Sequence, residues 1–205
     1  MKIKGIDVSK WQGNIDFDRV RKEGYKFVII RAGSGVNSDP YFERNYTLAK
    51  RAGLNVGVYW YSYAKSYYDA RNEAQILYKL LKGKQLEYPV YYDVEETSQF
   101  ARGKGFVNGI ICEFCGYLEN KGYYVGVYMS KSYIETFVLP ATLKKYDLWV
   151  AQYNTKCTYR GNYNMWQKSS KGKVNGINGN VDIDECYIDF AKIMKKKGLN
   201  GYAKK

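Results

Sequence analysis

The stretch Tyr88-Pro89-Val90-Tyr91-Tyr92-Asp93-Val94-Glu95 is an aromatic and β-branched run that ends in two carboxylates two positions apart. Such a composition predicts a strand. Side chains at i and i+2 of a strand share a face, with Cα atoms about 6.5 to 7 Å apart, so we expect Asp93 and Glu95 to face one site. Carboxyl groups this close disfavour simultaneous ionisation, so one can act as an acid while the other stays charged. The stretch therefore predicts the acid pair that a glycosidase uses.

Strand patterns alternate with helix patterns on both sides of this stretch. The strands are expected at Ile3–Val8, Lys26–Arg31, Asn55–Tyr63, Tyr88–Glu95 and Tyr123–Met129. The helices between them are expected at Asp16–Glu23, Pro40–Ala52, Tyr68–Leu81, Gly105–Asn120 and Ser132–Phe137. This alternation predicts an α/β protein whose parallel sheet is built from βαβ units.

The rhythm changes after residue 140. Three strands fit Asp147–Tyr153, Asn162–Lys168 and Asn180–Ile183, and a helix fits Glu185–Lys196. The gaps between these strands are too short for crossover helices. Eight strands and five intervening helices predict a shortened TIM-like barrel, (β/α)5(β)3, in one catalytic domain over residues 1–205. An open sheet that binds nucleotides is disfavoured, because no glycine-rich phosphate loop follows the first strand.

Strand parity separates the side chains of the predicted barrel into two sets. The set that should face the helices is apolar: Ile6, Val8, Val28, Ile30, Val90, Val94, Val125, Val127, Leu148, Val150, Val181 and Ile183. The set that should face inward is Asp7, Arg31, Tyr59, Tyr61, Asp93, Glu95, Tyr128, Trp149 and Asp182. Nearly all of the inward set is expected at the carboxyl ends of strands, where barrel enzymes keep their active sites.

The composition excludes several catalytic classes. The chain has no histidine, so a Ser-His-Asp triad, a Cys-His pair and an H-E-x-x-H zinc site are all impossible within it. We expect no metal and no cofactor. Cys112 and Cys115 are predicted to be reduced thiols buried on a helix, because no second C-x-x-C or histidine completes a zinc site. A bridge between Cys157 and Cys186 is left open.

The formal charge of +13 calls for an anionic partner. Nucleic acid is disfavoured because the only dense cluster is Lys195-Lys196-Lys197 and no nucleic-acid-binding motif accompanies it. An anionic polymer such as a bacterial cell wall explains the charge as well. No stretch approaches the roughly 20 apolar residues that span a bilayer, and no signal peptide is recognised. The expectation is synthesis in the cytoplasm, with holin-type release or another export route to the wall.

Four acids, Asp7, Asp93, Glu95 and Asp182, are expected to converge on one mouth. Any one of them alone could simply cap a loop or pair with a lysine, but four on the inward face favour a site. Asp184 shares the parity of Asp182 and could exchange roles with it. Glu96 falls on the opposite face from Glu95 and is expected to be a surface charge.

The motifs around these acids resemble, in order, those of the lysozymes of glycoside hydrolase family 25. They are Gly5-Ile6-Asp7-Val8-Ser9-Lys10-Trp11-Gln12-Gly13, Tyr92-Asp93-Val94-Glu95, Trp149-Val150-Ala151-Gln152-Tyr153, Trp166-Gln167 and Gly179-Asn180-Val181-Asp182. The resemblance implies the same barrel and hydrolysis of the β-1,4 bond between N-acetylmuramic acid and N-acetylglucosamine in bacterial peptidoglycan. It also implies an endolysin-like role, since phage members of the family act in this way.

The resemblance further implies a role for each acid. Glu95 matches the general acid, and Asp93 matches the partner that orients the 2-acetamido group or stabilises the oxocarbenium-like charge. Asp7 and Asp182 match two further acids that hold the site electrostatically or position water. Retention and inversion both remain open, because they differ in carboxylate separation.

Four further residues are candidates for substrate binding. Tyr61, Tyr128 and Trp149 are expected either to stack on sugar rings or to fill the barrel core. Arg31 is expected either to pair with one of the acids or to contact substrate.

Three competing functions remain. A carbohydrate-binding protein on the same scaffold is disfavoured because a binder need not keep Glu95. A chitinase is disfavoured because Pro89 and Tyr91 stand where the earlier acids of its D-x-x-D-x-D-x-E motif would lie. Nucleic-acid binding rests on charge alone, and the oligomeric state is left open.

Overall fold

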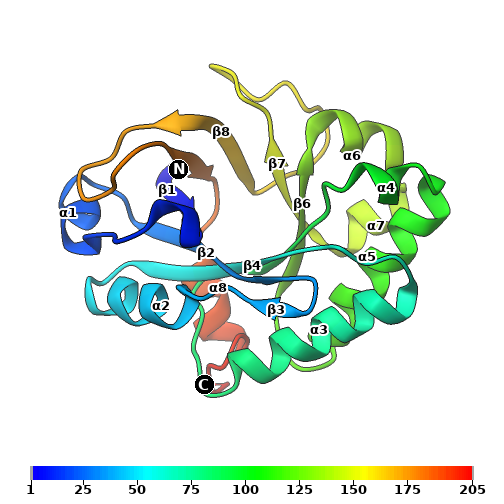
Figure 1. Cartoon of the computed structure of the whole chain (residues 1–205), viewed down its shortest axis with the longest axis horizontal. Helices are drawn as coiled ribbons and strands as arrows, with labels where there is room; N and C mark the ends of the chain where they lie inside the picture. The colour runs from blue at the N-terminus through cyan, green and yellow to red at the C-terminus, as the bar shows by residue number, and fades with distance from the viewer. Residues whose placement is uncertain (1, 205) are drawn as a thin grey trace.

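The fold is a closed barrel with helices on its outside (Figure 1). The structure, a computed structural model, describes residues 2–204. The strands are β1 (Ile3–Val8), β2 (Phe27–Ser34), β3 (Asn37–Ser38), β4 (Asn55–Tyr61), β5 (Val90–Asp93), β6 (Val125–Ser130), β7 (Asp147–Ala151), β8 (Met165–Gly172) and β9 (Val181–Cys186). The ring closes because β1 pairs with both β2 and β9, and the short β3 is added to β2 outside the ring.

A helix or helix pair crosses back after each of β1, β2, β4, β5 and β6. The helices are α1 (Phe17–Lys22), α2 (Phe42–Arg51), α3 (Tyr67–Leu81), α4 (Thr97–Phe100), α5 (Gly103–Glu119), α6 (Lys131–Phe137), α7 (Pro140–Lys145) and α8 (Phe190–Lys197), with a 3-10 turn η1 (Lys10–Gln12) after β1. The predicted five crossover units followed by three strands are therefore confirmed. Strands β1, β2, β4, β5, β6, β7 and β8 are parallel neighbours around most of the ring.

Strand parity divides the core into two layers, as predicted. Outward residues such as Val28, Val90 and Val150 pack with the helices in one large cluster. Inward residues form a second cluster inside the barrel that includes Tyr91 and Trp149. The two layers explain why β5 can be fully buried and still carry carboxylates, because its inward side chains reach the mouth only where the strand ends.

Strand β9 runs antiparallel to both β8 and β1, a direction that the sequence left open. Its length differs from the prediction: β9 continues to Cys186, so the predicted helix at Glu185–Lys196 begins only at Phe190. Pairing with β1 extends β9, since Glu185 and Cys186 lie opposite Lys4 and Ile3, and the side chain of Asp189 caps the helix by accepting a hydrogen bond from the Lys192 N–H.

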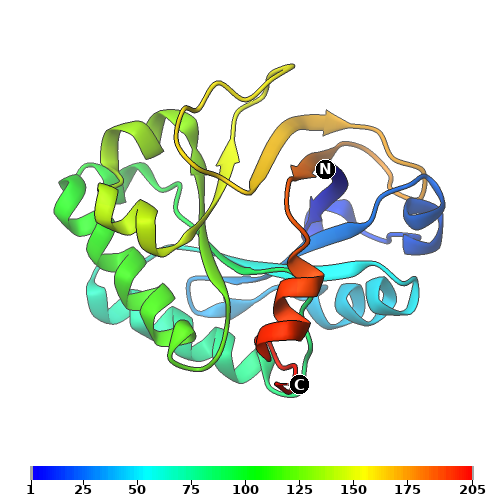
Figure 2. The same cartoon turned by 180° about the vertical axis from the view of Figure 1, so that it is seen from behind.

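Helix α8 closes the amino end of the barrel. Phe190 and Met194 are fully buried in the inner cluster, and the ring of Phe190 meets the rings of Tyr88 and Tyr124 edge-on. Figure 2 shows α8 running down to the C-terminus beneath the sheet. The barrel is thus filled from below, and its inward side chains reach the surface at the carboxyl ends of its parallel strands.

The four cysteines are all free thiols, so Cys157 and Cys186 are not bridged. Cys115 and Cys186 are buried, but Cys112 is exposed, so the prediction of a buried thiol at Cys112 is wrong. Across residues 2–204, no helix is long and apolar enough to cross a membrane.

Candidate active site

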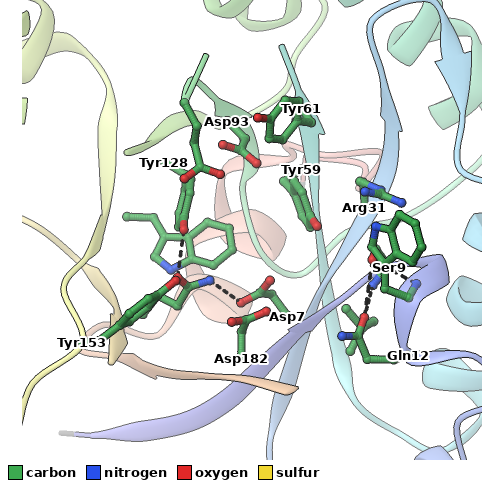
Figure 3. A pocket seen from close by; sticks show the side chains of 15 residues that line it. Asp7, Ser9, Gln12, Arg31, Tyr59, Tyr61, Asp93, Tyr128, Tyr153 and Asp182 are labelled. Carbon is green, nitrogen blue, oxygen red and sulfur yellow. Dashed lines mark hydrogen bonds between the residues drawn. The ribbon is translucent and has the colours of Figure 1, made fainter. Parts of the chain in front are cut away.

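A pocket of about 250 Å³ opens at the mouth of the barrel (Figure 3). Every predicted site residue lines it: Asp7, Arg31, Tyr61, Asp93, Glu95, Tyr128, Trp149 and Asp182. Val8, Ser9, Trp11, Gln12, Tyr59, Tyr153 and Gln167 complete the lining. The lining comes from strands around the whole ring, so closure of the barrel is what brings these residues together.

The strand register explains how the acids meet. On one side of the mouth Asp93 lies level with Tyr61 and Tyr128 on the flanking strands. On the other side Asp7 lies level with Asp182 across the pair β1–β9. Asp182 stands at the start of its strand and not at its end, which differs from the prediction. It still reaches the mouth because β9 runs in the opposite direction to the other strands.

Asp93 and Glu95 form an interacting pair. Burial raises the pKa of Asp93 well above its usual range, the Glu95 carboxylate raises it further, and the Arg31 guanidinium opposes the rise. Burial also raises the pKa of Glu95, with contributions from the charges of Asp182 and Glu96. Asp93 is only 3% exposed, whereas Glu95 is half-buried and faces the pocket. The pair can therefore hold one proton between two carboxyl groups near neutral pH.

Asp7, Asp182 and Asp184 form a second cluster of acids. Burial raises the pKa of Asp7 well above its usual range, and the charges of Asp184 and Asp182 raise it further. Burial raises the pKa of Asp182 to about 6. Asp184 does not line the pocket but is fully buried beside it, where its Oδ1 accepts a hydrogen bond from Trp149 Nε1 at 2.9 Å. It thus holds the indole that forms part of the pocket wall.

Gln167 links the acids to the aromatic residues. Its Nε2 donates to Asp7 Oδ2 at 2.8 Å, and its Oε1 accepts from the Tyr128 hydroxyl at 2.8 Å and from the Tyr153 hydroxyl at 3.1 Å. One amide therefore fixes the position of a carboxylate and of two rings. The inward parity of β8 was the sequence signal that could have identified Gln167.

Arg31 pairs with an acid outside the predicted four. Its Nε and Nη2 reach Asp39 Oδ2 at 2.8 and 2.7 Å. Asp39 also accepts hydrogen bonds from the backbone N–H groups of Lys10 and Tyr41. Among the predicted alternatives for Arg31, the structure shows a buried ion pair, although not with a catalytic candidate. Asp39 carried no signal in the sequence because it follows the two-residue strand β3.

Glu96 is not the simple surface charge that was predicted. Its Oε1 accepts a hydrogen bond from the Tyr61 hydroxyl at 2.8 Å, and its side chain is half-buried. The chain leaves the β conformation of β5 after Asp93, so the parity that separates Glu95 from Glu96 no longer applies there. Glu96 therefore contributes its charge to the mouth.

The aromatic residues of the pocket differ in exposure. Trp149 is 1% exposed and Tyr128 is 6% exposed, so both offer little surface to a ligand. Trp11 is 75% exposed and Tyr153 is 59% exposed at the rim of the same pocket. Neither Trp11 nor Tyr153 was predicted as a binding residue. Trp11 follows a strand, where parity gives no signal, whereas Tyr153 shares the parity of Trp149 in the predicted strand Asp147–Tyr153 and could have been identified.

A buried polar network supports the mouth from behind. The Tyr92 hydroxyl donates to Glu73 Oε2 at 2.6 Å and lies 2.7 Å from the Ser62 hydroxyl. Gln99 Nε2 donates to that hydroxyl at 2.8 Å, and the Tyr63 N–H donates to Glu73 Oε1. The network joins α3, β5, α4 and the loop after β4. It therefore fixes the loop that follows Tyr61 and the loop that carries Glu95.

The arrangement suits acid catalysis by carboxyl groups. Several acids with raised pKa values share a small pocket, which is the environment that keeps a carboxylic acid protonated near neutral pH. Within residues 2–204, no group of three or more His, Cys, Asp or Glu side chains is placed to hold a metal ion. Asp93 Oδ1 is buried without a hydrogen-bond partner among these residues, so the site contains an acceptor that an incoming N–H or O–H could satisfy.

Comparison with protein families gives one match over most of the chain. The sequence profile described as glycosyl hydrolases family 25 matches residues 6–177. An autolytic lysozyme of Clostridium acetobutylicum is 34% identical over 185 residues, which cover 89% of this chain and 55% of that protein.

Solved structures agree on the fold. The modular autolysin LytC of Streptococcus pneumoniae superposes with a TM-score of 0.83 at 29% identity, covering 91% of this chain and 47% of that one. A bacterial lysozyme of Streptomyces coelicolor superposes with a TM-score of 0.78 at 25% identity, covering 98% of both chains. The chain thus spans about half the length of the autolytic lysozyme and of LytC, but the whole of the Streptomyces coelicolor lysozyme chain.

Proposed function

Because the chain belongs to glycosyl hydrolase family 25, we propose that it is a 1,4-β-N-acetylmuramidase that cleaves bacterial peptidoglycan between N-acetylmuramic acid and N-acetylglucosamine. Relatives named lysozyme or autolysin support this substrate. The observation that carries the proposal is the pair Asp93 and Glu95 at the end of β5, facing Asp7 and Asp182 across one pocket. Retention of all four acids also argues against a protein that only binds glycan.

Glu95 acts as the general acid in this proposal. It is the member of the pair that faces the open pocket, so it can reach a glycosidic oxygen there. Burial raises its pKa above the usual range for a glutamate, which favours the protonated form that a general acid needs. The proton passes to the leaving oxygen as the glycosidic bond breaks, and a water molecule completes the hydrolysis by adding to the sugar carbon.

Asp93 acts on the sugar that develops positive charge. The sequence predicted a permanently charged partner, but burial favours the neutral form of Asp93 more strongly than that of Glu95. We therefore assign one proton to the pair as a unit. Once Glu95 takes up and delivers that proton, Asp93 remains as a carboxylate whose unpaired Oδ1 can accept the N–H of the acetamido group.

The remaining residues position the substrate. Asp182, with a pKa raised to about 6, carries negative charge at neutral pH on the far side of the pocket, and Gln167 fixes the position of Asp7. Trp11, Tyr61 and Tyr153 provide partly exposed rings for sugar stacking. Tyr128 and Trp149 form the floor of the pocket, so they act mainly by shaping it. Arg31 acts through its charge on Asp93 while it stays paired with Asp39.

Digestion of purified peptidoglycan, followed by borohydride labelling of new reducing ends, tests the reaction. Labelled muramic acid supports the muramidase. Labelled glucosamine would instead require a glucosaminidase, and a chitinase would release ends from chitin. Absence of any release would favour a binding protein.

Glu95→Gln tests the assignment of the acid. It keeps the shape of the side chain but cannot donate the proton, so we expect the rate to fall by about a hundredfold or more. The matched control is Glu113→Gln on α5, which removes only a surface ion pair with Arg71. Full activity of Glu95→Gln would refute the mechanism.

We also propose that residues 1–205 form a single catalytic unit that works at the cell wall. The lysozyme of Streptomyces coelicolor, which the chain matches over 98% of both lengths, supports a domain of this size. A cytoplasmic origin with holin-type release stays a prediction from the sequence, and so does the absence of a nucleic-acid partner.

A further inference from the structure

Cationic side chains gather at the amino end of the barrel, opposite the pocket. The parallel strands begin there, and the helices that return from the mouth end there. Lysine or arginine follows or ends α2, α3, α5 and α7, and the last turn of α8 adds three more. We call this surface the basic end, and it comprises Lys50, Arg51, Lys79, Lys82, Lys84, Lys121, Lys144, Lys145, Lys195, Lys196, Lys197 and Lys204.

Contacts between distant segments make the basic end one continuous surface. The Asn200 N–H, just beyond α8, donates to the Gly122 carbonyl at 3.0 Å, in the loop before β6. Lys82 and Lys121 follow different helices, yet each ammonium lies 5.5 Å from the ring centre of Tyr78. Figures 1 and 2 both show the C-terminus beside the end of α3.

Few carboxylates neutralise this surface. Salt bridges pair Lys50 with Glu87, Lys84 with Glu43 and Lys145 with Glu119. Within residues 2–204, the other cations of the basic end have no carboxylate partner. Cations in the last turn of a helix also interact favourably with its dipole. That effect fades beyond the last turn, so it does not account for Lys82, Lys121 or Lys204.

Two hollows in the basic end combine lysine with tyrosine. One of about 430 Å³ is lined by Lys144 and Lys145 together with Tyr159, Asn162 and Tyr163. The Asp147 carboxylate also lines it, but it is buried and accepts hydrogen bonds from the Tyr91 hydroxyl and the Asn164 amide. An ammonium group suits a phosphate, whereas tyrosine rings and asparagine amides suit the carbon chain and hydroxyl groups of a polyol or sugar.

The second hollow, of about 320 Å³, is lined by Lys50, Lys84, Tyr46 and Tyr123. Both of its lysines already pair with carboxylates, whereas in the first hollow Lys145 pairs with Glu119 and Lys144 has no such partner among residues 2–204, so the first hollow is the stronger candidate for an anion.

Exposed apolar side chains lie elsewhere. The large ones are Trp11, Val36, Tyr63, Tyr67, Tyr68, Leu139 and Tyr153, and none of them belongs to the basic end. A surface that docks on a bilayer places aromatic or aliphatic side chains beside its cations so that they enter the acyl boundary. The basic end therefore fits a hydrated anionic polymer better than a lipid surface.

We propose that the basic end binds a phosphodiester-linked polymer of polyols or sugars carried by the cell wall, while the mouth at the other end stays free for the glycan. Binding by the basic end is separate from hydrolysis and does not depend on the proposed reaction. It would hold the enzyme at its substrate without occupying the pocket.

The test measures binding to purified poly(glycerol phosphate), using Glu95→Gln as the background so that no glycan is cut. One variant carries Lys82→Gln, Lys121→Gln, Lys144→Gln and Lys195→Gln. The matched control carries the same loss of charge at exposed lysines outside the basic end, namely Lys65→Gln, Lys104→Gln, Lys156→Gln and Lys173→Gln. Thermal unfolding verifies that both variants are folded.

We expect the basic-end variant to raise Kd about tenfold or more at low salt and to reduce the slope of log Kd against log salt by up to about one per lysine. The control should stay within about twofold of the background. Equal losses in both variants would show that only net charge matters and would overturn the proposal. Unchanged binding in both would overturn it as well.

Two further arms separate the polymer from other anions. Tighter binding to phosphatidylglycerol vesicles, or to double-stranded DNA, than to poly(glycerol phosphate) would contradict the polymer assignment. In the active background, the basic-end variant should match the parent on short soluble glycan and on walls stripped of the polymer, but be slower on intact walls. A lower rate of hydrolysis on soluble glycan would instead show that the substitutions had disturbed the pocket.

Discussion

At the scale of single residues, the mouth is governed by carboxyl groups that burial keeps close to protonation. Asp7, Asp93 and Asp184 are each at least nine-tenths buried, and each has a raised pKa because ionisation there loses hydration. Their mutual repulsion adds to the effect. The site thus stores unfavourable electrostatic energy that a neutral or cationic ligand can relieve.

Glu96→Gln tests how far the charge of Glu96 reaches. Burial is the main cause of the raised pKa of Glu95, and the Glu96 carboxylate adds to it. Removing that charge should lower the pKa of Glu95, so the alkaline limb of the kcat/KM profile should move to lower pH. Glutamine still offers an oxygen to the Tyr61 hydroxyl. Glu113→Gln is the control and should leave the pH profile unchanged. If Glu96→Gln also left the alkaline limb at the same pH, the Glu96 charge would have no effect on the pKa of Glu95.

Asp184→Asn should stabilise the fold at neutral pH. Burial raises the pKa of Asp184 well above its usual range, so the folded state binds a proton that the unfolded state releases, and stability falls as pH rises above about 4. Asparagine removes this loss and keeps an oxygen for Trp149 Nε1. Thermal unfolding should show Tm higher by a few degrees at pH 7 and nearly equal at pH 4. A lower Tm at both pH values would contradict the argument.

At the scale of elements, side chains from neighbouring strands occupy the space that small residues leave. The ring of Phe27 on β2 lies directly over Gly5 on β1, where an added Cβ would approach it to 2.2 Å. The ring of Tyr91 covers Gly126 in the same way, at 2.5 Å. These close approaches let large aromatic side chains fill a narrow barrel.

Gly5→Ala should therefore destabilise the barrel. Phe27 is fully buried and cannot move aside without disturbing the inner cluster, so we expect a loss of about 1 to 3 kcal/mol in the free energy of unfolding. Gly105→Ala is the matched control, because its Cβ would meet nothing within 4 Å on helix α5. The free energy of unfolding of Gly105→Ala should rise by up to about 1 kcal/mol, because alanine favours the helix more than glycine does. Guanidinium unfolding of both variants measures the difference.

Tyr92→Phe probes the buried network that joins α3 to β5. Burial raises the pKa of Glu73 to about 7, while the Tyr92 hydroxyl favours the ionised form. Loss of this donor should cost about 1 to 3 kcal/mol when Glu73 is charged. The loss should be larger at pH 8.5 than at pH 5.5, where the carboxyl group is neutral in the folded state. Guanidinium unfolding at the two pH values checks this, and equal losses would exclude Glu73 as the cause.

At the scale of the whole molecule, the barrel has two ends with different chemistry. The carboxyl end is acidic and hollow, whereas the amino end is basic and closed by α8. All four thiols belong to the body between them and are free. Because the thiols differ in burial, the reaction rate of each one reports on the opening of a different part of the folded protein.

Thiol titration should distinguish local from global opening. Cys112 is exposed and should react at once, and the half-buried Cys157 should react more slowly. Burial raises the pKa of Cys115 well above its usual range and that of Cys186 to about 11. Since the thiolate is the reactive form, these two should react only at the rate of global unfolding. Four fast thiols in the folded protein would contradict the closed barrel.

The sequence predicted most of the fold because strand parity and helix periodicity are local. It placed the inward residues correctly, since alternation within one strand needs no knowledge of the partner strand. It misjudged Asp182 and the helix expected at Glu185, because strand direction and length depend on pairing with β1 and β8. Asp39 and Trp11 were not predicted because loop residues follow no period. Asp184 was noticed, but only tertiary packing shows that it lies behind the pocket.

Both ends of the described chain lie away from the mouth. Lys2 precedes β1 and bonds to Glu185 at the end of β9, and Lys204 packs against Gly198 at the end of α8. A tether fixed to either terminus would therefore leave from the face that α8 closes. Beads or films that carry the protein by one terminus should present the pocket outward, and the attached enzyme should work on dissolved glycan at nearly the rate of the free one.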